Sequence, residues 1–282
     1  MLTYAAMALL CFGVSVLGTV AGFGGGIIVI PMLTVLFDVP IHLAIGSTML
    51  ALVPGAGAAA YGYLRRRLID FPLGLWTLIT TLGLTYVGAA ISASLSAEWL
   101  EPLYTVLLLL LARKMWFNAT GVARPPGALS RALMHLNQVG PIFRRDRVDA
   151  LGVHHRYAAS FLLVLVLGAA AGTVAGLFGV GGGIFTTPVM VLAFKVPVRV
   201  AVATSLMMTT VVAAVGSASH YAHGHVDLEL AGVLAAGMTL GGLLGPRLGG
   251  KLSEKKLKYA VAGMLGGVGL ITGLSAVVHR FS

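Results

Sequence analysis

Long apolar segments with almost no charge dominate this sequence and restrict what it can fold into. An α-helix needs about 20 apolar residues to cross the hydrocarbon core of a bilayer, which is about 30 Å thick. Only 10% of the residues are charged and 58% are hydrophobic, whereas a soluble domain carries about 25% charged residues. We therefore predict an all-α polytopic membrane protein in the cell (inner or plasma) membrane, with the lipid bilayer as a partner. The segments long enough to span are Ile41–Tyr63, Pro72–Leu95, Phe161–Leu177, Val198–Tyr221 and Leu230–Pro246.

The first apolar segment, Leu2–Val20, has no basic residue before it and continues directly into a glycine-rich stretch. It is predicted to be a structural span and not a cleaved signal peptide. Cys11 is the only cysteine, so no internal disulfide can form. The net charge of +10 could indicate a nucleic-acid partner, but cytoplasmic loops of membrane proteins are rich in Lys and Arg for topological reasons. We expect no nucleic-acid partner, no cofactor and no metal.

The chain contains an internal duplication. With an offset of 157 residues, Gly24–Ile27 falls on Gly181–Ile184 and Pro31 falls on Pro188, and the register continues downstream. We predict an N-terminal transmembrane repeat (1–117), a basic cytoplasmic linker (118–157) and a C-terminal transmembrane repeat (158–282). Each repeat is expected to hold one glycine-interrupted segment and then three helices, at 41–63, 72–95 and 97–117 in the first and at 198–221, 228–250 and 254–278 in the second.

The distribution of Lys and Arg predicts how the two repeats are oriented. If Arg65–Arg67 and the linker are cytoplasmic, and the glycine-interrupted segment crosses an even number of times, every Lys and Arg except Arg280 lies on the cytoplasmic side. A single crossing of that segment would place them on both sides. The positive-inside rule favours the first arrangement, in which the repeats are inverted and both termini are extracytoplasmic. The choice between two crossings and a re-entrant hairpin stays open.

Three consecutive glycines interrupt an apolar segment in each repeat, at Gly24–Gly26 and at Gly181–Gly183. Close packing between helices is one explanation. However, three adjacent glycines serve every face of a helix, and the piece that follows, Ile27–Phe37, would rise only ~17 Å, about half a bilayer. A helix that starts inside the membrane leaves N–H groups without partners, and its positive dipole end favours an anion. We therefore predict discontinuous or re-entrant helices whose glycines bind a small anionic substrate.

Hydroxyl side chains are the second predicted component of this site. Ser/Thr pairs occupy equivalent places near the starts of the helices at 41–63 and 198–221, and another pair follows the second glycine triplet. Hydroxyls can donate to an oxyanion, or they can bond the carbonyl four residues earlier in their own helix. One arginine either extends to the cytoplasmic interface or balances the charge of the anion. The predicted substrate-binding residues are Gly24, Gly25, Gly26, Ser47, Thr48, Gly181, Gly182, Gly183, Thr186, Thr187, Thr204, Ser205 and Arg247.

Two other groups of residues are candidates for chemistry. Asp70 and Asp227 could form a carboxylate pair, but the inverted topology would place them on opposite sides of the membrane. We predict instead that each caps the helix that follows it. His220, His223 and His225 offer ligands for a metal ion, but they fall in a predicted outside loop, and we favour a solvated loop.

The doubled pattern of a glycine triplet, a following proline and a Ser/Thr pair, with a basic central linker, resembles the sulfite exporter TauE/SafE family of permeases. The triplets stand in GFGGG at 22–26 and GLFGVGGG at 176–183. The resemblance covers nearly the whole chain and implies about eight helices. It also implies movement of small sulfur-containing anions such as sulfite, sulfoacetate or related sulfonates, but names neither the substrate nor the direction.

From these features we predict a transporter of small sulfur-containing oxyanions that works by alternating access around two glycine-broken helices. The alternatives are an anion channel and a secondary transporter of another small carboxylate or oxyanion. An enzyme is not expected, because no nucleophile and base can be placed together. Coupling to protons or ions stays open, and so does assembly into a homo-oligomer.

Overall fold

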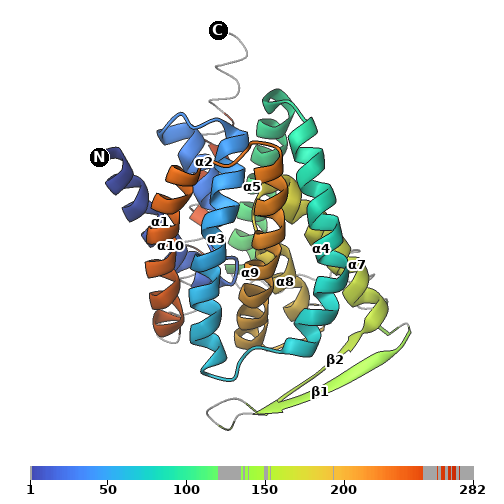
Figure 1. The fold of residues 1–282 in the computed structure, drawn as a ribbon. Coiled ribbons are helices and arrows are strands. Elements are labelled where there is room, and N and C mark those ends of the chain that lie inside the picture. Colours follow the sequence, from blue (N-terminus) through green and yellow to red (C-terminus); the bar gives the residue numbers. More distant parts are fainter. Residues whose placement is uncertain are drawn as a thin grey trace.

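The computed structural model describes residues 2–119, 140–148, 154–192 and 194–249, with isolated positions in 135–138, at 152 and in 259–273. Within these residues the chain is mostly helical (Figure 1). The first half holds α1 (Leu2–Ala21), α2 (Gly26–Leu36), α3 (Ile41–Leu64), α4 (Phe71–Ser94) and α5 (Ala97–Ala119). The second half holds β1 (Ile142–Val148), β2 (His154–Ser160), α7 (Phe161–Phe178), α8 (Gly183–Leu192), α9 (Val198–Ala222) and α10 (Leu228–Leu248).

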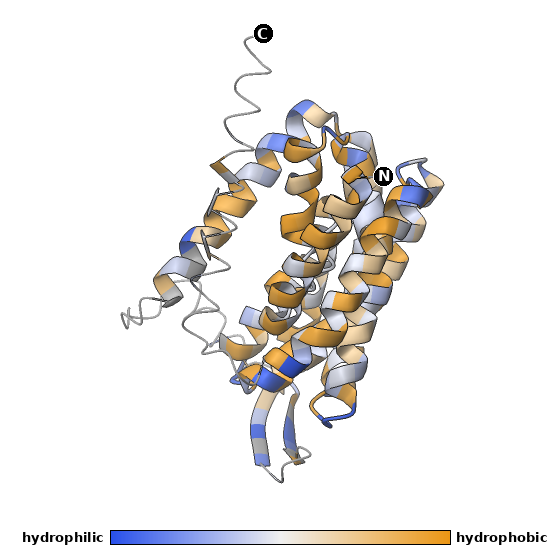
Figure 2. Ribbon diagram, turned by 90° about the vertical axis from the view of Figure 1, so that its left-hand side faces the viewer, coloured by the Kyte–Doolittle hydropathy of each residue, from blue (hydrophilic) through white to orange (hydrophobic). Residues whose placement is uncertain are grey.

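Six of the described helices are long and apolar enough to cross a membrane: α1, α3, α4, α7, α9 and α10. Hydrophobic residues cover the helical body, and hydrophilic residues gather near the helix ends and in the hairpin (Figure 2). This distribution supports a multi-pass membrane protein. The bounds of the predicted helices at 41–63, 72–95, 198–221 and 228–250 agree with α3, α4, α9 and α10 to within two residues. Most of the predicted last helix, 254–278, lies outside the described residues.

Rows of small residues allow two pairs of spanning helices to pack with their backbones in contact. On α7, Gly168, Gly172 and Gly176 lie against the carbonyls of every fourth residue of α4 from Thr77 to Thr85. On α10, glycines spaced four apart lie in the same way against backbone carbonyls of α1. Small residues at this spacing are the usual means of close helix approach in a bilayer. As a result, α4 packs on α7 and α10 packs on α1, so each half of the chain contacts the other.

The predicted linker contains a feature that the sequence analysis missed, an antiparallel hairpin of β1 and β2. The all-α prediction is therefore corrected to a mostly helical fold with one hairpin. Strand β2 ends at Ser160 and α7 begins at Phe161, so the predicted boundary between residues 157 and 158 falls inside the strand. Residues 120–134 of the predicted linker lie outside the described residues.

The hairpin is attached to the helical body by a buried ion pair. Arg145 and Tyr157 are cross-strand partners, so their side chains share one face of the hairpin. Arg145 Nη2 and Nε donate to the two carboxylate oxygens of Asp70 at 3.1 and 3.2 Å, and the Tyr157 hydroxyl donates to the same carboxylate. Asp70 is fully buried. The pair fixes the hairpin, and through it the start of α7, to the start of α4.

Asp70 and Asp227 both cap helices, as predicted. The Asp70 carboxylate accepts from Leu73 N at the start of α4, and the Asp227 carboxylate accepts from Glu229 N and Leu230 N at the start of α10. Each therefore satisfies N–H groups that the first turn of a helix leaves without partners.

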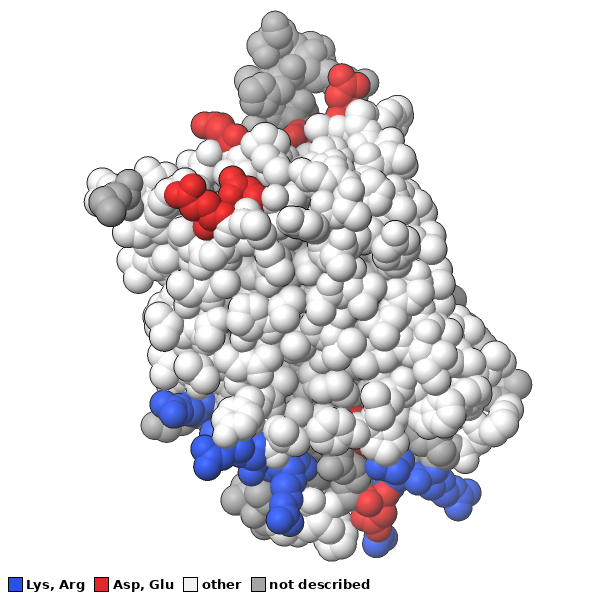
Figure 3. Space-filling model, viewed as in Figure 1, with Lys and Arg blue, Asp and Glu red and all other residues white. Residues whose placement is uncertain are grey.

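The charged residues separate towards the two ends of the helical body. On the face shown in Figure 3, Lys and Arg gather at the lower end, and Asp and Glu lie mainly at the upper end. The basic end holds Arg65–Arg67, which follow α3, and the hairpin with Arg145. Both lie at this end because Asp70, at the start of α4, follows Arg65–Arg67 closely in the chain and pairs with Arg145. The acidic end holds Asp227 and Glu229, at the start of α10.

Candidate functional site

The first glycine triplet lies in a segment that separates two helices. Helix α1 ends at Ala21 and α2 begins at Gly26. Gly22, Gly24 and Gly25 have φ angles of 91°, 77° and 104°, in the left-handed region that favours glycine. We call Gly22–Gly26, which ends with the first residue of α2, the first glycine segment. The Gly18 carbonyl accepts from three of its N–H groups, those of residues 22–24. Among the described residues, no acceptor bonds the next three N–H groups, from Gly25 to Ile27.

The second triplet repeats this arrangement. Helix α7 ends at Phe178 and α8 begins at Gly183. We call Gly179–Gly183, which ends with the first residue of α8, the second glycine segment. Three of its residues, Gly179, Gly181 and Gly182, have φ angles of 67°, 66° and 76°. The N–H groups from Gly182 to Ile184 likewise have no acceptor in the part of the chain that the structure describes. Both short helices therefore begin with free donors at their positive dipole ends.

The two glycine segments lie directly against each other. A Cβ atom at Gly183 would lie 2.6 Å from the Gly22 carbonyl oxygen and 2.8 Å from Phe23 Cα. A Cβ atom at Gly26 would lie 3.4 Å from the Gly179 carbonyl oxygen. Only residues without side chains permit this contact, which brings together segments more than 150 residues apart in the sequence.

Leu52 of α3 and Thr209 of α9 lie beside both segments. A Cβ at Gly24 would lie 2.9 Å from a Leu52 methyl and 3.6 Å from the Thr209 methyl. A Cβ at Gly181 would lie 3.4 Å from a Leu52 methyl and 2.6 Å from the Thr209 methyl. A Cβ at Gly183 would lie 2.9 Å from Thr209 Oγ1. Leu52 and Thr209 are equivalent in the duplication, and each lies about halfway along its helix. They therefore place the glycine segments near the middle of the protein.

The Thr209 hydroxyl is fully buried and has no hydrogen-bond partner among the described residues. A buried polar group without a partner costs about 1–3 kcal/mol, so it needs an explanation. The sequence analysis missed Thr209, because its equivalent in the first repeat, Leu52, is apolar and the duplication gave no matched pair.

Tyr104 of α5 is a second residue that the sequence analysis missed. Its hydroxyl donates to the Ile27 carbonyl oxygen at 2.9 Å, in the first turn of α2. Its ring packs edge-on against Phe178, the last residue of α7, with centroids 5.6 Å apart. One buried side chain therefore holds together the helix after the first segment and the helix before the second.

Three of the predicted hydroxyls lie at the glycine segments. Ser205 and Thr187 donate to the Gly22 carbonyl oxygen at 3.0 and 3.1 Å, and Thr186 bonds Ser205 at 2.8 Å. These bonds join α8 and α9 to the first glycine segment. The sequence analysis had named these residues as substrate ligands, and in this structure they bond protein groups.

Three of the other predicted residues, Ser47, Thr204 and Arg247, lie away from the glycine segments. Ser47 accepts from Asp227 N at 3.0 Å, and Thr204 accepts from Asp70 N at 2.9 Å, so both lie at helix starts near the ends of the body. The Thr48 hydroxyl is buried without a partner among the described residues. Arg247 is exposed in the last turn of α10.

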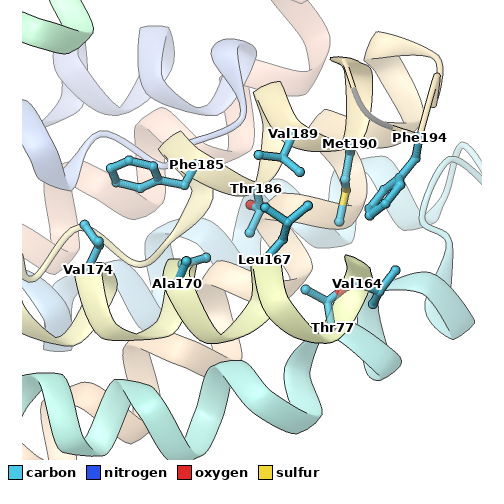
Figure 4. Close-up of a pocket in the computed structure, with 11 residues that line it drawn as sticks. Thr77, Val164, Leu167, Ala170, Val174, Phe185, Thr186, Val189, Met190 and Phe194 are labelled. Carbon is cyan, nitrogen blue, oxygen red and sulfur yellow. The ribbon is translucent and has the colours of Figure 1, made fainter. Parts of the chain in front are cut away.

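A cavity of about 160 Å³ lies between α4, α7 and α8, beside the second segment (Figure 4). Its two polar side chains, Thr77 and Thr186, already bond the Leu73 carbonyl and Ser205. A cavity without free donors or charge does not suit an anion, so we do not assign the anion to it. Its apolar lining includes Leu167, Val174, Phe185, Val189, Met190 and Phe194.

Comparison with known proteins places the chain in a family. The family model described as sulfite exporter TauE/SafE matches residues 7–272. The chain belongs to the TauE/SafE family. This TauE/SafE chain is 28% identical over 247 residues to the "Probable membrane transporter protein YunE" of Bacillus subtilis, covering 85% of this chain and 86% of the relative. The resemblance that the glycine pattern indicated is therefore confirmed.

Two further relatives carry similar descriptions. The "Probable membrane transporter protein MJ0441" of Methanocaldococcus jannaschii is 26% identical over 274 residues, covering 92% of this chain and 91% of the relative. The "Probable membrane transporter protein YdhB" of Bacillus subtilis is 23% identical over 248 residues, covering 87% and 91%. No solved structure matches the TauE/SafE chain. The family and its relatives support a role in membrane transport.

Proposed function

We propose that this protein transports small sulfur-containing oxyanions, such as sulfite or organosulfonates, by alternating access around the two glycine segments. The observation that carries the proposal is the pair of short helices, α2 and α8, each of which starts with free N–H groups against the glycine segment of the other repeat. Backbone groups at this depth need protein, water or substrate as partners. Helix starts favour anions, and the absence of side chains lets a ligand approach the backbone.

In this proposal α1 with α2, and α7 with α8, each form one glycine-broken segment that enters and returns. The repeats are inverted, as two equivalent contacts support. Ser47 at the start of α3 bonds Asp227 at the start of α10, and Thr204 at the start of α9 bonds Asp70 at the start of α4. Because α3 and α4 begin at opposite ends of the body (Figure 1), the equivalent helices α3 and α9 begin at opposite ends too.

The substrate site that we propose lies where the glycine segments face Thr209. The free N–H groups of α2 and α8 and the unpartnered Thr209 hydroxyl supply donors, and the Thr48 hydroxyl on α3 is a further candidate. In the present structure the segments are in contact, which corresponds to a closed site. Ser205, Thr186 and Thr187 then serve by exchanging their bonds to protein for bonds to the anion, which their contact with Gly22 supports.

The basic end of the body is proposed to be cytoplasmic, with the predicted linker on that side and both termini outside. In intact cells, a cysteine at Ala222, the exposed last residue of α9 at the acidic end of the protein, is expected to react with a membrane-impermeant maleimide. A cysteine at Arg66 is expected to react only after the cells are permeabilised. Reaction of both cysteines in intact cells, or the opposite pattern, would overturn this orientation.

An anion channel is the main alternative. A selectivity filter needs a ring of ligands from several copies or subunits, whereas the two glycine segments provide one pair of helix starts. The alternative of a carrier for another small carboxylate or oxyanion shares the same site. Uptake of labelled sulfite, sulfoacetate, sulfate and acetate into proteoliposomes separates these functions. We expect saturable uptake with sulfite or sulfoacetate preferred, and ionic current that rises linearly with voltage would contradict a carrier.

The Thr209 hydroxyl offers a specific test of the site. Thr209→Val removes the hydroxyl with little change in volume, and we expect the transport KM to rise about tenfold or more, because a hydrogen bond to a charged group contributes about 1.5–3 kcal/mol. Thr209→Ser should retain most of the affinity. Thr210→Val is the matched control, because the Thr210 hydroxyl bonds the Leu206 carbonyl in its own helix. An unchanged KM in Thr209→Val would remove this residue from the site.

A further inference from the structure

Four histidines gather at the acidic end of the protein, although they come from two distant parts of the sequence. The rings of His42, in the first turn of α3, and His225, in the loop before α10, stack with centroids 4.8 Å apart. The His225 ring lies 6.1 Å from that of His220 and 6.3 Å from that of His223. We call these four residues the histidine cluster. The sequence analysis had linked three of them, and His42 was not expected there.

The cluster runs from solvent into the helical body. His223 is exposed, His225 and His42 are half-buried, and His220 is fully buried. His220 Nε2 lies 3.3 Å from the Gly176 carbonyl oxygen of α7. A carbonyl only accepts, so Nε2 carries the proton in this bond and Nδ1 keeps its lone pair. The Nδ1 atoms of His220, His42 and His225 are buried with no partner among the described residues.

The loop of the cluster closes one end of the body. Its backbone at His225 lies against Gly46, where a side chain on α3 would collide with it. Asp227 N donates to Ser47, and the Val226 side chain packs beside Gly46. The cluster therefore lies at a joint between α3 of the first half and α7 and α9 of the second. These are the parts that alternating access would move relative to each other.

Among the described residues, no salt bridge joins a carboxylate to a histidine of the cluster. Helix α7 has no ionisable residue, and α3 contributes His42 alone at this end. On α10, the Asp227 carboxylate already accepts from two backbone N–H groups, and Glu229 interacts with Tyr4 of α1. Adding a proton would therefore place positive charge between two stacked imidazole rings.

We propose that the histidine cluster is a proton-binding site whose protonation opens the acidic end of the protein. Protons added to the free Nδ1 atoms make the rings of His42 and His225 repel each other, and the loop separates from α3. Burial, followed by the neighbouring His42 and His223, lowers the pKa of His225. A lowered pKa means that the closed state is favoured at neutral pH and loses this advantage as the pH falls below about 6.5. The inference rests on the proposed function in one respect: it assumes that the acidic end opens and closes during transport.

Four neighbouring imidazoles could instead bind a metal ion. Among the residues that the structure describes, no three His, Cys, Asp or Glu side chains are placed as ligands of one ion. His42 and His225 also face each other with their rings 27° from parallel, an arrangement that does not point two lone pairs at one ion. We therefore assign the cluster to protons and make the metal an outcome of the test.

The test measures accessibility and needs no substrate. In a Cys11→Ala background, single cysteines replace Val226, which packs beside Gly46, and Ala222, which is exposed. Each purified variant in nanodiscs is labelled with a maleimide at pH 7.5 and at pH 5.5. The labelling rate of Val226→Cys is divided by that of Ala222→Cys, because this ratio cancels the intrinsic pH dependence of the thiol. If opening restores an ordinary pKa to one imidazole, the ratio should rise about tenfold at pH 5.5.

The rise should disappear in the double variant His42→Gln/His225→Gln. An equal ratio at both pH values with the histidines intact would overturn the proposal, whether or not the double variant folds. A rise that persists in the double variant would also overturn it. Protection of Val226→Cys at pH 7.5 by micromolar Zn²⁺, lost in the double variant, would reassign the cluster to a metal. Because no anion is present, failure to transport sulfite would leave this result standing.

Discussion

Replacing Gly183 with leucine is expected to reduce anion flux at least about tenfold while the protein still inserts into the membrane. A Cβ at this position would lie 2.6 Å from the Gly22 carbonyl oxygen and 2.8 Å from Phe23 Cα. Both are backbone atoms that cannot rotate away, so the two glycine segments must separate. Overpacking of this kind costs about 1–3 kcal/mol, and the change falls where we place the substrate. Flux into proteoliposomes, normalised to the amount of inserted protein, measures the effect.

Gly232→Leu is the matched control for this change. Gly232 lies in α10, in the same half of the chain, and a Cβ there has nothing within 4 Å. The control should transport at the unmodified rate. Equal flux in both variants would show that close contact between the glycine segments is not needed for transport.

Replacing Asp70 with alanine is expected to destabilise the protein by about 3 kcal/mol. The change removes the cap of α4 and both carboxylate oxygens that Arg145 and Tyr157 contact. Breaking a buried ion pair from one side costs about 3–5 kcal/mol, and the lower end applies because the Arg145 side chain is 28% exposed and can rehydrate. Thermal unfolding of the purified protein in detergent measures the loss.

The duplication supplies the control for this prediction. Asp227 is the equivalent residue and caps α10 in the same way, but it is exposed and holds no hairpin. Asp227→Ala should therefore cost only the cap, about 1 kcal/mol. If the two variants lost the same stability, the ion pair between the hairpin and Asp70 would contribute nothing.

The sequence predicted the helical elements and the caps well because both depend on local patterns. The length of an apolar run predicts a membrane-spanning helix, and an aspartate directly before the run predicts its N-cap. These patterns predicted the helices α3, α4, α9 and α10 and the capping roles of Asp70 and Asp227. The end of α1 at Ala21 and the start of α2 at Gly26 fit the glycine triplet for the same reason.

Features that depend on distant pairs were not predicted. Strand β1 is rich in arginine and reads as a solvated linker, and only its contact with Asp70, 75 residues earlier, shows why Arg145 is buried in part. Likewise, His42 meets His225 across 183 residues, and nothing near either residue signals the other.

The predicted site shows the same division. The glycines and the hydroxyls of Thr186 and Thr187 were predicted from their place at the triplet, and Ser205 from the Ser/Thr pair that both repeats share near a helix start. In the structure they do lie together. Thr209 and Tyr104 were missed because an ordinary helical threonine and an ordinary tyrosine carry no local signal. Their positions follow from how α9 and α5 pack on the glycine segments.

Counterflow tests the central claim most directly, that an anion carrier works through the two glycine segments. Proteoliposomes are loaded with unlabelled sulfite and diluted into a trace of labelled sulfite, and the internal label is followed with time. The unmodified protein and Gly232→Leu should both accumulate label transiently above equilibrium, and Gly183→Leu should not. A label that only approaches equilibrium in the unmodified protein, or an equal overshoot in Gly183→Leu, would contradict the account.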